Sequence, residues 1–290
     1  MHDPLNPSTL DARIRHVYAQ LSSAERKLAD MVLTRQRELL GYSATELAGL
    51  AGTSKSSAAR FFRSLGYAGY DEFRQALRAA QLQQSPLARM EQPRRKRSLA
   101  QQFQSHLQTD AGLLSAWAES IPEAQLEAAI AMLVRARKVW VVGYRHSHLT
   151  AFYAQSLLAQ VRGEVGSLND VAGREADLLA SASEKDVLLA VDFRRRSTRL
   201  PRLLAAAQAV GVQTLVLTDA PVSALAMQAQ VVLRCGASSP QGLFDSYVCA
   251  VSLVNFLASG LAQQQRVPTQ ERLERIERLH VALDDLEPQL

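Results

Sequence analysis

Residues 43–74 read S-A-T-E-L-A-G-L-A-G-T-S-K-S-S-A-A-R-F-F-R-S-L-G-Y-A-G-Y-D-E-F-R, and this stretch decides the first part of the fold. Ser43, with Glu46 three residues later, has the spacing of a capping box at the start of a helix. Gly52 permits the left-handed backbone that ends a helix, and Ser54 supplies an N-cap for the next one. Two short helices joined by a tight turn containing glycine predict a helix-turn-helix.

The second helix of this pair is expected to expose polar side chains. Ala58, Phe61 and Phe62 form its predicted buried side. Hydroxyl and basic groups contact base edges and phosphates in the major groove of DNA. An ordinary helical hairpin with a solvated basic face has the same spacing, so the pattern alone leaves both interpretations open. The candidate DNA-contacting residues are Ser54, Lys55, Ser56, Ser57, Arg60 and Arg63.

The charge distribution favours DNA binding. Residues 1–97 contain 16 Lys and Arg against 9 Asp and Glu, a net charge of +7. Residues 98–290 contain 17 against 19, a net charge of −2. The positive charge therefore lies in the part of the chain that carries the helix pair, as binding to the phosphates of double-stranded operator DNA requires.

The rest of the composition excludes several classes of protein. No apolar run reaches the roughly 18 residues of a membrane span, and no secretory signal precedes the first helix. Cys235 and Cys249 lie in apolar surroundings, which is typical of buried thiols in a reducing compartment. We therefore expect a cytoplasmic protein with no contact to a membrane.

The chain is expected to form two domains, so the fold class is multidomain. Residues 1–80 have helical periodicity throughout and predict an all-α domain. Residues 81–98 contain glutamines, two prolines and the basic run Arg94–Arg97, which mark a linker. The basic run either touches the DNA backbone or is a solvated charge cluster. Residues 99–290 are predicted to form an α/β domain.

In this second domain, short β-branched runs alternate with helical segments, which predicts a central parallel sheet flanked by helices. A C-terminal amphipathic helix at 269–286 packs either on its own sheet or on a partner subunit. The expected strands are 138–143, 163–168, 186–191, 212–218 and 230–235, and the expected helices 99–136 (broken near Pro122), 149–161, 199–210, 224–228 and 244–263.

Two predicted strand-to-helix loops have side chains that suit an anion. Ligands of parallel sheets bind beyond the carboxyl ends of the strands, where helix N-termini and guanidinium groups favour phosphate or carboxylate. Each loop alone also fits an ordinary helix start, and the arginine run also fits a solvated face. The candidate ligand-binding residues are Gly143, Arg145 and Ser147 in the first loop, and Asp192, Arg194, Arg195, Ser197 and Thr198 in the second.

These residues resemble the RpiR (MurR/RpiR) family of bacterial transcriptional regulators. The resemblance is most specific in residues 51–74, with an Arg-Phe pair and an L-G-Y-x-G-Y-x-x-F-R tail. It continues more loosely in V-V-G-Y-R-H-S at 141–147, D-F-R-R-R-S at 192–197 and T-D-A-P-V-S-A-L-A at 218–226.

The resemblance implies a helix-turn-helix domain followed by a sugar isomerase (SIS) domain that binds a phosphosugar and assembles as a homodimer or homotetramer. It also implies that Ser147 and Ser197 hold the phosphate. Asp192 departs from the family's serine, and a carboxylate repels phosphate unless an arginine pairs with it. A sugar-acid or polyol ligand therefore stays open.

The sequence predicts a ligand-responsive transcriptional regulator rather than an enzyme. We expect no catalytic residue, metal or cofactor, because no base with a positioned partner can be named and H-x-H at 146–148 is only a weak metal pattern. Two alternatives remain. In the first, the chain is a phosphosugar isomerase-type enzyme with an accessory nucleic-acid-binding module. In the second, it is a constitutive DNA binder that uses its SIS domain only to oligomerise.

Overall fold

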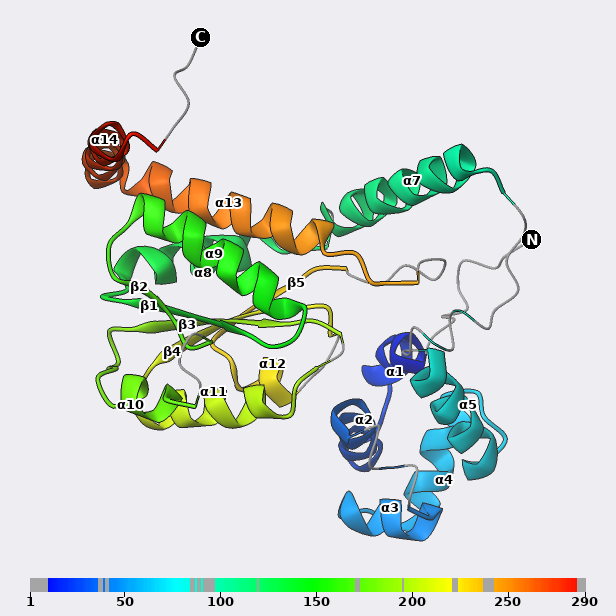
Figure 1. The fold of residues 1–290 in the computed structure, drawn as a ribbon. Coiled ribbons are helices and arrows are strands. Elements are labelled where there is room, and N and C mark those ends of the chain that lie inside the picture. The colour runs from blue at the N-terminus through cyan, green and yellow to red at the C-terminus, as the bar shows by residue number, and fades with distance from the viewer. Residues whose placement is uncertain are drawn as a thin grey trace. The chain divides into compact units, whose positions relative to one another are not determined.

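The computed structural model divides into two compact units. The first comprises residues 1–96 and 221–224, and the second comprises residues 97–220 and 225–290. Figure 1 shows the elements of each unit. The predicted linker bounds, 81 and 98, stay a prediction, and residues 94–96 of its basic run lie outside the described part. The structure describes residues 10–35, 39, 42–83, 87, 90, 97–118, 120–169, 173–194, 196–220, 224–236 and 243–285.

The first unit is helical, as predicted. Its core is built from large apolar side chains, and an aromatic group centred on Phe73 packs against Phe61 and Phe62. Each of these three rings is almost fully buried. The described helices are α1 (Leu10–Tyr18), α2 (Ser23–Arg35), α3 (Ala44–Leu50), α4 (Lys55–Ser64) and α5 (Tyr70–Gln83).

Local rules fix the helix-turn-helix. The Ser43 N–H donates to Glu46 Oε2 (2.7 Å) and the Glu46 N–H donates to Ser43 Oγ (3.3 Å), which confirms the capping box at the start of α3. Gly52 has a φ of +59°, the left-handed conformation expected after this helix. Ser54 caps α4 by accepting the Ser57 N–H at 3.1 Å. The predicted turn is therefore confirmed.

The second unit contains a five-stranded parallel sheet with the strand order β2-β1-β3-β4-β5. Two long helices, α7 (Leu99–Ala118) and α8 (Glu123–Arg135), precede it and are separated at Pro122, as predicted. The strands are β1 (Val139–Gly143), β2 (Val165–Ser167), β3 (Val187–Asp192), β4 (Gln213–Thr218) and β5 (Val231–Arg234).

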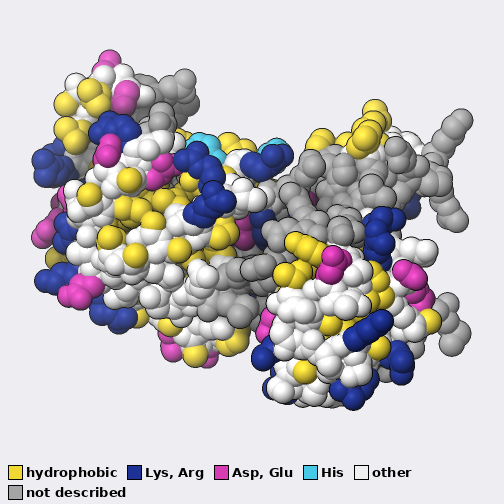
Figure 2. Space-filling view, turned by 90° about the horizontal axis from the view of Figure 1, so that it is seen from below, with side chains coloured by type: hydrophobic (Ala, Val, Ile, Leu, Met, Phe, Trp, Pro, Cys, Tyr) yellow, Lys and Arg dark blue, Asp and Glu magenta, His cyan; other side chains and the backbone are white. Residues whose placement is uncertain are grey.

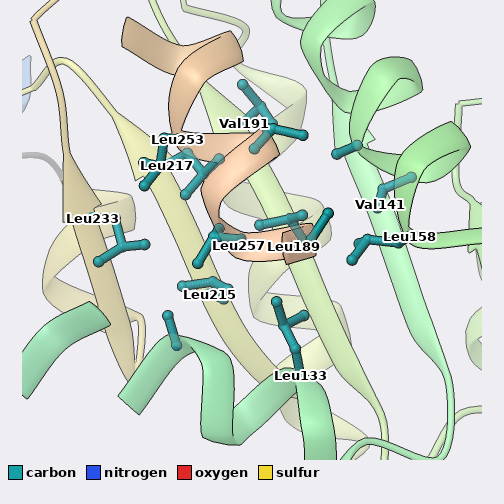
Figure 3. Packing of buried hydrophobic residues seen from close by; sticks show 14 of the residues in the cluster. Leu133, Val141, Leu158, Leu189, Val191, Leu215, Leu217, Leu233, Leu253 and Leu257 are labelled. Carbon is teal, nitrogen blue, oxygen red and sulfur yellow. The ribbon is translucent and has the colours of Figure 1, made fainter. Parts of the chain in front are cut away.

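Helices cover both faces of this sheet. Alternate strand residues point to opposite faces, because the side-chain period of a strand is two. Val141, Leu189 and Leu215 pack with Leu133 of α8, Leu158 of α9 (Ser147–Val161) and Leu257 of α13 (Val248–Gln264) (Figure 3). On the other face, Trp140, Leu188 and Val216 pack with α10 (Glu175–Leu179), α11 (Arg199–Ala209) and α12 (Ala224–Gln228).

The C-terminal helix α14 (Arg266–Leu283) docks on its own domain through polar contacts. Thr269 Oγ1 donates to the Val161 carbonyl (3.1 Å), and Arg272 Nε donates to the Ala159 carbonyl (2.7 Å). Both carbonyls belong to the last turns of α9. The leucines at 273, 279 and 283 of the predicted apolar stripe are nevertheless exposed.

The structure corrects several predicted boundaries. α10 (Glu175–Leu179) lies in a segment for which no helix was predicted. α14 begins before Pro268 rather than after it, since a proline in the first turn removes an N–H that has no partner within the helix. The helix predicted to begin at 244 begins at Val248.

Two glycines test the geometry of the turn. Gly49 lies in α3 with open space around it, so Gly49→Ala should stabilise the protein by about 1 kcal/mol through higher helix propensity. Gly52 has equal space but a φ of +59°, so Gly52→Ala should destabilise by about 1–2 kcal/mol. Thermal denaturation of both variants of the full chain measures the difference, and shifts of the same sign would contradict the assigned turn.

Candidate nucleic-acid interface and ligand cavity

Helix α4 divides cleanly into a buried side and an exposed side. Ala58, Phe61 and Phe62 are buried in the core of the first unit. The other side is exposed and carries the candidate DNA-contacting residues Lys55, Ser56, Arg60 and Arg63, with the N-cap Ser54 also exposed. Lys and Arg side chains are present over the surface of this unit on the face turned to the viewer in Figure 2. The arrangement offers hydroxyl and guanidinium groups along one face of one helix.

Ser57 does not belong to this exposed face, so its predicted outward position is wrong. Its side chain is buried at 6% exposure. Its hydroxyl lies 3.0 Å from Ser54 Oγ and accepts a hydrogen bond from Arg60 Nη2 at 3.3 Å. The hydroxyl therefore takes part in the N-cap and contacts Arg60.

Two further residues lie on the exposed side of α4 that the sequence reasoning passed over. Ala59 is half-buried one turn after Lys55 and one turn before Arg63, and Ser64 is exposed. The Ser64 hydroxyl donates to the Phe61 carbonyl at 2.8 Å, whereas the Ala59 methyl is of the kind that contacts thymine methyl groups. Their place follows from the 3.6-residue period, which could have identified them.

The loop after β1 approaches itself closely. A Cβ on Gly143 would lie 2.4 Å from the Ser147 carbonyl oxygen, so only glycine fits there. The Gly143 N–H donates to Asn169 Oδ1 (2.9 Å), and Asn169 Nδ2 donates to the Gly143 carbonyl (2.7 Å). Arg145 has a φ of +59°, which turns the chain at the exposed tip of this loop. Asn169 thus holds the loop against the end of β2, a role with no sequence signal.

Ser147 faces inward. Its side chain is 2% exposed, and its hydroxyl accepts the Phe193 N–H at 3.1 Å. This hydrogen bond joins the loop after β1 to the end of β3. The Ser147 hydroxyl thus has a partner within the protein, and its expected contact with a ligand stays a prediction.

Asp192 is also buried, together with a second carboxylate. Arg196 Nε lies 3.2 Å from Asp192 Oδ2, and Arg196 Nη2 donates to Asp219 Oδ1 at the end of β4. Burial raises the pKa of Asp192 to about 6, although Arg196 acts in the opposite direction. Burial also raises the pKa of Asp219. One guanidinium therefore serves two carboxylates, and the expected ligand contact of Asp192 stays a prediction.

The other candidate ligand-binding residues of the second loop differ in how far they are buried and in what they contact. The Arg194 carbonyl accepts the Tyr247 hydroxyl at 3.4 Å, and the Arg194 side chain is half-buried. Ser197 Oγ accepts the Arg199 N–H at 3.2 Å, and Thr198 is exposed at the start of α11. Arg195 lies outside the described residues. Of this loop, Ser197 and Thr198 lie beside the first residue of α11.

A cavity of about 320 Å³ lies at the carboxyl end of β1, next to the loop that follows this strand. It contains Gly143 and Arg145 from the predicted set, but not Ser147, Asp192, Arg194, Ser197 or Thr198. The other residues come from the loop after β1, from α9, from the segment after β2 and from α10 and α11. The lining residues are Gly143, Tyr144, Arg145, His148, Asn169, Gly173, Glu175 and Arg199.

Charged groups dominate this cavity. Arg199 Nη2 lies 2.6 Å from Glu175 Oε1, and its guanidinium carbon lies 5.4 Å from the centre of the Tyr144 ring. The Tyr144 hydroxyl lies 3.5 Å from Glu175 Oε1. Burial raises the pKa of Tyr144, so its hydroxyl stays protonated and can donate. Arg145 and Arg199 together suit an anion with hydroxyl groups.

The two histidines of the first loop lie in different environments. His148 lines the cavity, whereas His146 is exposed. Among the described residues, no group of three or more His, Cys, Asp or Glu side chains is placed to hold a metal ion. No helix in the described part of the chain is long and apolar enough to cross a membrane.

Because the Asp192 carboxylate is buried, we expect the stability of the folded chain to depend on pH. Because its pKa rises from 3.8 to about 6 on folding, the folded chain binds this proton more tightly than the unfolded chain. Stability is therefore lost as pH rises from about 4 to about 6, by up to about 3 kcal/mol. Asp192→Asn, which stays neutral, should gain stability relative to the wild type over this window. Denaturation at several pH values tests this, and a difference independent of pH would contradict it.

The chain matches two family models. Residues 8–85 match the model described as "Helix-turn-helix domain, rpiR family", and residues 132–260 match the SIS domain. The fold resembles that of a solved structure of Vibrio vulnificus NanR complexed with ManNAc-6P, with a TM-score of 0.58 and 20% identity. That match covers 95% of this chain and 99% of the other.

Curated relatives have names of the same kind. The uncharacterized HTH-type transcriptional regulator YbbH of Bacillus subtilis is 24% identical, over 88% of this chain and 90% of its own length. HexR of Pseudomonas aeruginosa, an HTH-type transcriptional regulator, is 26% identical over 89% and 90%. The chain also matches the bifunctional protein glk of Paraburkholderia xenovorans, at 24% identity, but spans only 44% of its length.

Proposed function

The chain is a transcription regulator of the RpiR family, with an rpiR-type helix-turn-helix domain followed by a SIS domain, and from this premise we propose how it is controlled. A small anionic ligand, a phosphorylated sugar or a related sugar acid, binds in the SIS cavity and changes the affinity of the helix-turn-helix for operator DNA. The observation that carries this proposal is the pair Arg145 and Arg199 in one cavity at the carboxyl end of the sheet.

The size and chemistry of the cavity support this ligand class. A volume of about 320 Å³ falls within the usual range for small-molecule sites. The guanidinium groups bind the anionic end, and Asn169, His148 and the Tyr144 hydroxyl are placed to meet sugar hydroxyls. NanR of Vibrio vulnificus, which shares the fold, is complexed with ManNAc-6P.

The same cavity provides a route to the second loop. Gly143 and Arg145 belong to the segment that Ser147 ties to Phe193, directly after β3. A ligand that repositions this segment therefore acts on residues 192–198 and on the helices that follow both loops. We propose that the resulting SIS packing sets the spacing of paired DNA-binding domains, so that the ligand shifts a population between two arrangements.

Exposed apolar side chains support a homo-oligomer. Tyr153 of α9 donates from its hydroxyl to Asn255 Oδ1 of α13 at 2.7 Å, so these two helices lie side by side (Figure 1). Phe152, directly before Tyr153, and Phe256, directly after Asn255, are 56% and 48% exposed. A second copy that covers these rings would pair two helix-turn-helix domains, as half-site recognition requires.

We propose that the SIS domain senses its ligand without converting it. Glu175 and His148 are the groups in the cavity that an isomerase-type alternative would use as a base. Glu175 is instead held by Arg199 at 2.6 Å. Incubation of the protein with each sugar phosphate that binds, followed by analysis of the sugar, distinguishes the two: turnover would favour the enzyme.

Arg199→Ala tests the ligand site. A thermal-shift screen of the wild type against sugar phosphates, sugar acids and polyol phosphates should find a compound that raises the melting temperature saturably. Arg199→Ala should weaken binding of that compound at least ten-fold, because a charge-assisted hydrogen bond is lost. The matched control is Arg202→Ala, an exposed arginine one turn further along α11. An equal loss in both variants, or none in Arg199→Ala, would contradict the assigned site.

Arg63→Ala tests the DNA interface. Arg63 lies on the exposed face of α4, so its removal should weaken binding to operator oligonucleotides, selected from random DNA, by about 1–3 kcal/mol. The circular dichroism spectrum should stay unchanged, because the side chain is not part of the core. Fluorescence anisotropy at fixed salt measures the affinity, with Arg202→Ala as the control of equal charge. Wild-type operator affinity of Arg63→Ala would overturn this assignment.

A further inference from the structure

One carboxylate lies inside the cavity that is otherwise built for an anion. Glu175, the first residue of α10, is mostly buried, with a side-chain exposure of 13%, whereas Arg199 is 61% exposed. Its Oε1 atom lies 2.6 Å from Arg199 Nη2 and 3.5 Å from the Tyr144 hydroxyl. The carboxylate therefore already occupies Arg199, which the proposed site uses to bind the anionic end of the ligand.

We infer that Glu175 is an internal competitor of the ligand, and that the ligand's anionic group displaces it from Arg199. The inference rests on the proposed function, since it takes this cavity as the ligand site. An anion that binds Arg199 in the bidentate geometry uses two of its nitrogens, and Glu175 already occupies Nη2. An anion that binds through Nη2 must therefore break the Glu175–Arg199 ion pair.

The charges of the cavity fit this role. Apart from His148, the cavity is lined by three side chains that can carry a charge: Arg145, Arg199 and Glu175. Removal of the carboxylate leaves two guanidinium groups for one ligand anion. Glu175 thus lowers the affinity of the empty cavity for anions in general and sets the ligand concentration at which the regulator responds.

Displacement of Glu175 also has a structural consequence. α10 spans only Glu175–Leu179, and Arg174, its N-cap residue, forms no side-chain cap hydrogen bond. Leu179 anchors the end of α10 in the core, while the Glu175–Arg199 ion pair links its first residue to the first residue of α11. Loss of this pair therefore releases the first turn of α10, which couples the presence of a ligand to a local change of conformation.

The experiment compares Glu175→Gln with a matched change on the same helix. Asp177→Asn removes the same charge two residues later, from a side chain that is 68% exposed and pairs only with Arg174 among the described residues. Binding of inorganic phosphate is measured by calorimetry at constant ionic strength, and Arg199→Ala shows how much of that binding belongs to the cavity. Circular dichroism confirms that each variant is folded, and Glu175→Asp retains the charge.

Glu175→Gln should bind phosphate about five-fold more tightly than the wild type, as loss of a partly exposed competing ion pair predicts. Asp177→Asn should stay within about two-fold of the wild type, because this exposed carboxylate pairs with Arg174 and not with a residue of the cavity. Phosphate should also speed amide hydrogen exchange in residues 175–179 of the wild type, but not in Glu175→Gln.

Equal or weaker binding by Glu175→Gln would overturn the inference and leave the ligand site standing, since the carboxylate would then assist the ligand. An equal gain in Asp177→Asn would also overturn it, because the effect would be one of net charge. Phosphate binding that is the same in Arg199→Ala as in the wild type would instead overturn the proposed site itself.

Discussion

The hydrogen bond from the Phe193 N–H to Ser147 Oγ (3.1 Å) is the contact on which the arrangement of the SIS domain's loops depends. It is buried, and it joins the segments that leave β1 and β3, two neighbouring strands of the sheet. Gly143 makes it possible, because a side chain there would collide with the Ser147 carbonyl. This hydrogen bond therefore ties the two loops directly to each other.

Electrostatics divide the two loops into different tasks. In the second loop, Arg196 is already shared by Asp192 and Asp219, so its charge is used within the protein. In the cavity beside the first loop, Arg145 and Arg199 lie closer to solvent, and Glu175 opposes only one of them. Buried charges need partners, whereas exposed ones can exchange them. The second loop is thus suited to hold the structure and the first to meet the ligand.

Local sequence rules were sufficient for the helix-turn-helix, since Ser43, Glu46, Gly52 and Ser54 act on their own neighbours. The parallel sheet also followed, because each buried strand is a short β-branched run. The ligand cavity followed only in part. Gly143 and Arg145 lie in the predicted loop, but Asn169 and Glu175 reach the cavity through tertiary packing and carry no motif. The outward position predicted for Ser57 was wrong, because a hydroxyl looks the same in sequence whether it is buried or exposed.

The central claim is that ligand and operator bind to coupled sites, and coupling of this kind must be reciprocal. The most direct measurement is the affinity of the stabilising compound for the free protein and for the protein saturated with operator DNA. We expect the two affinities to differ by the same factor by which the compound changes operator affinity. Equal affinities in both states would contradict the account and reduce the SIS domain to an oligomerisation module.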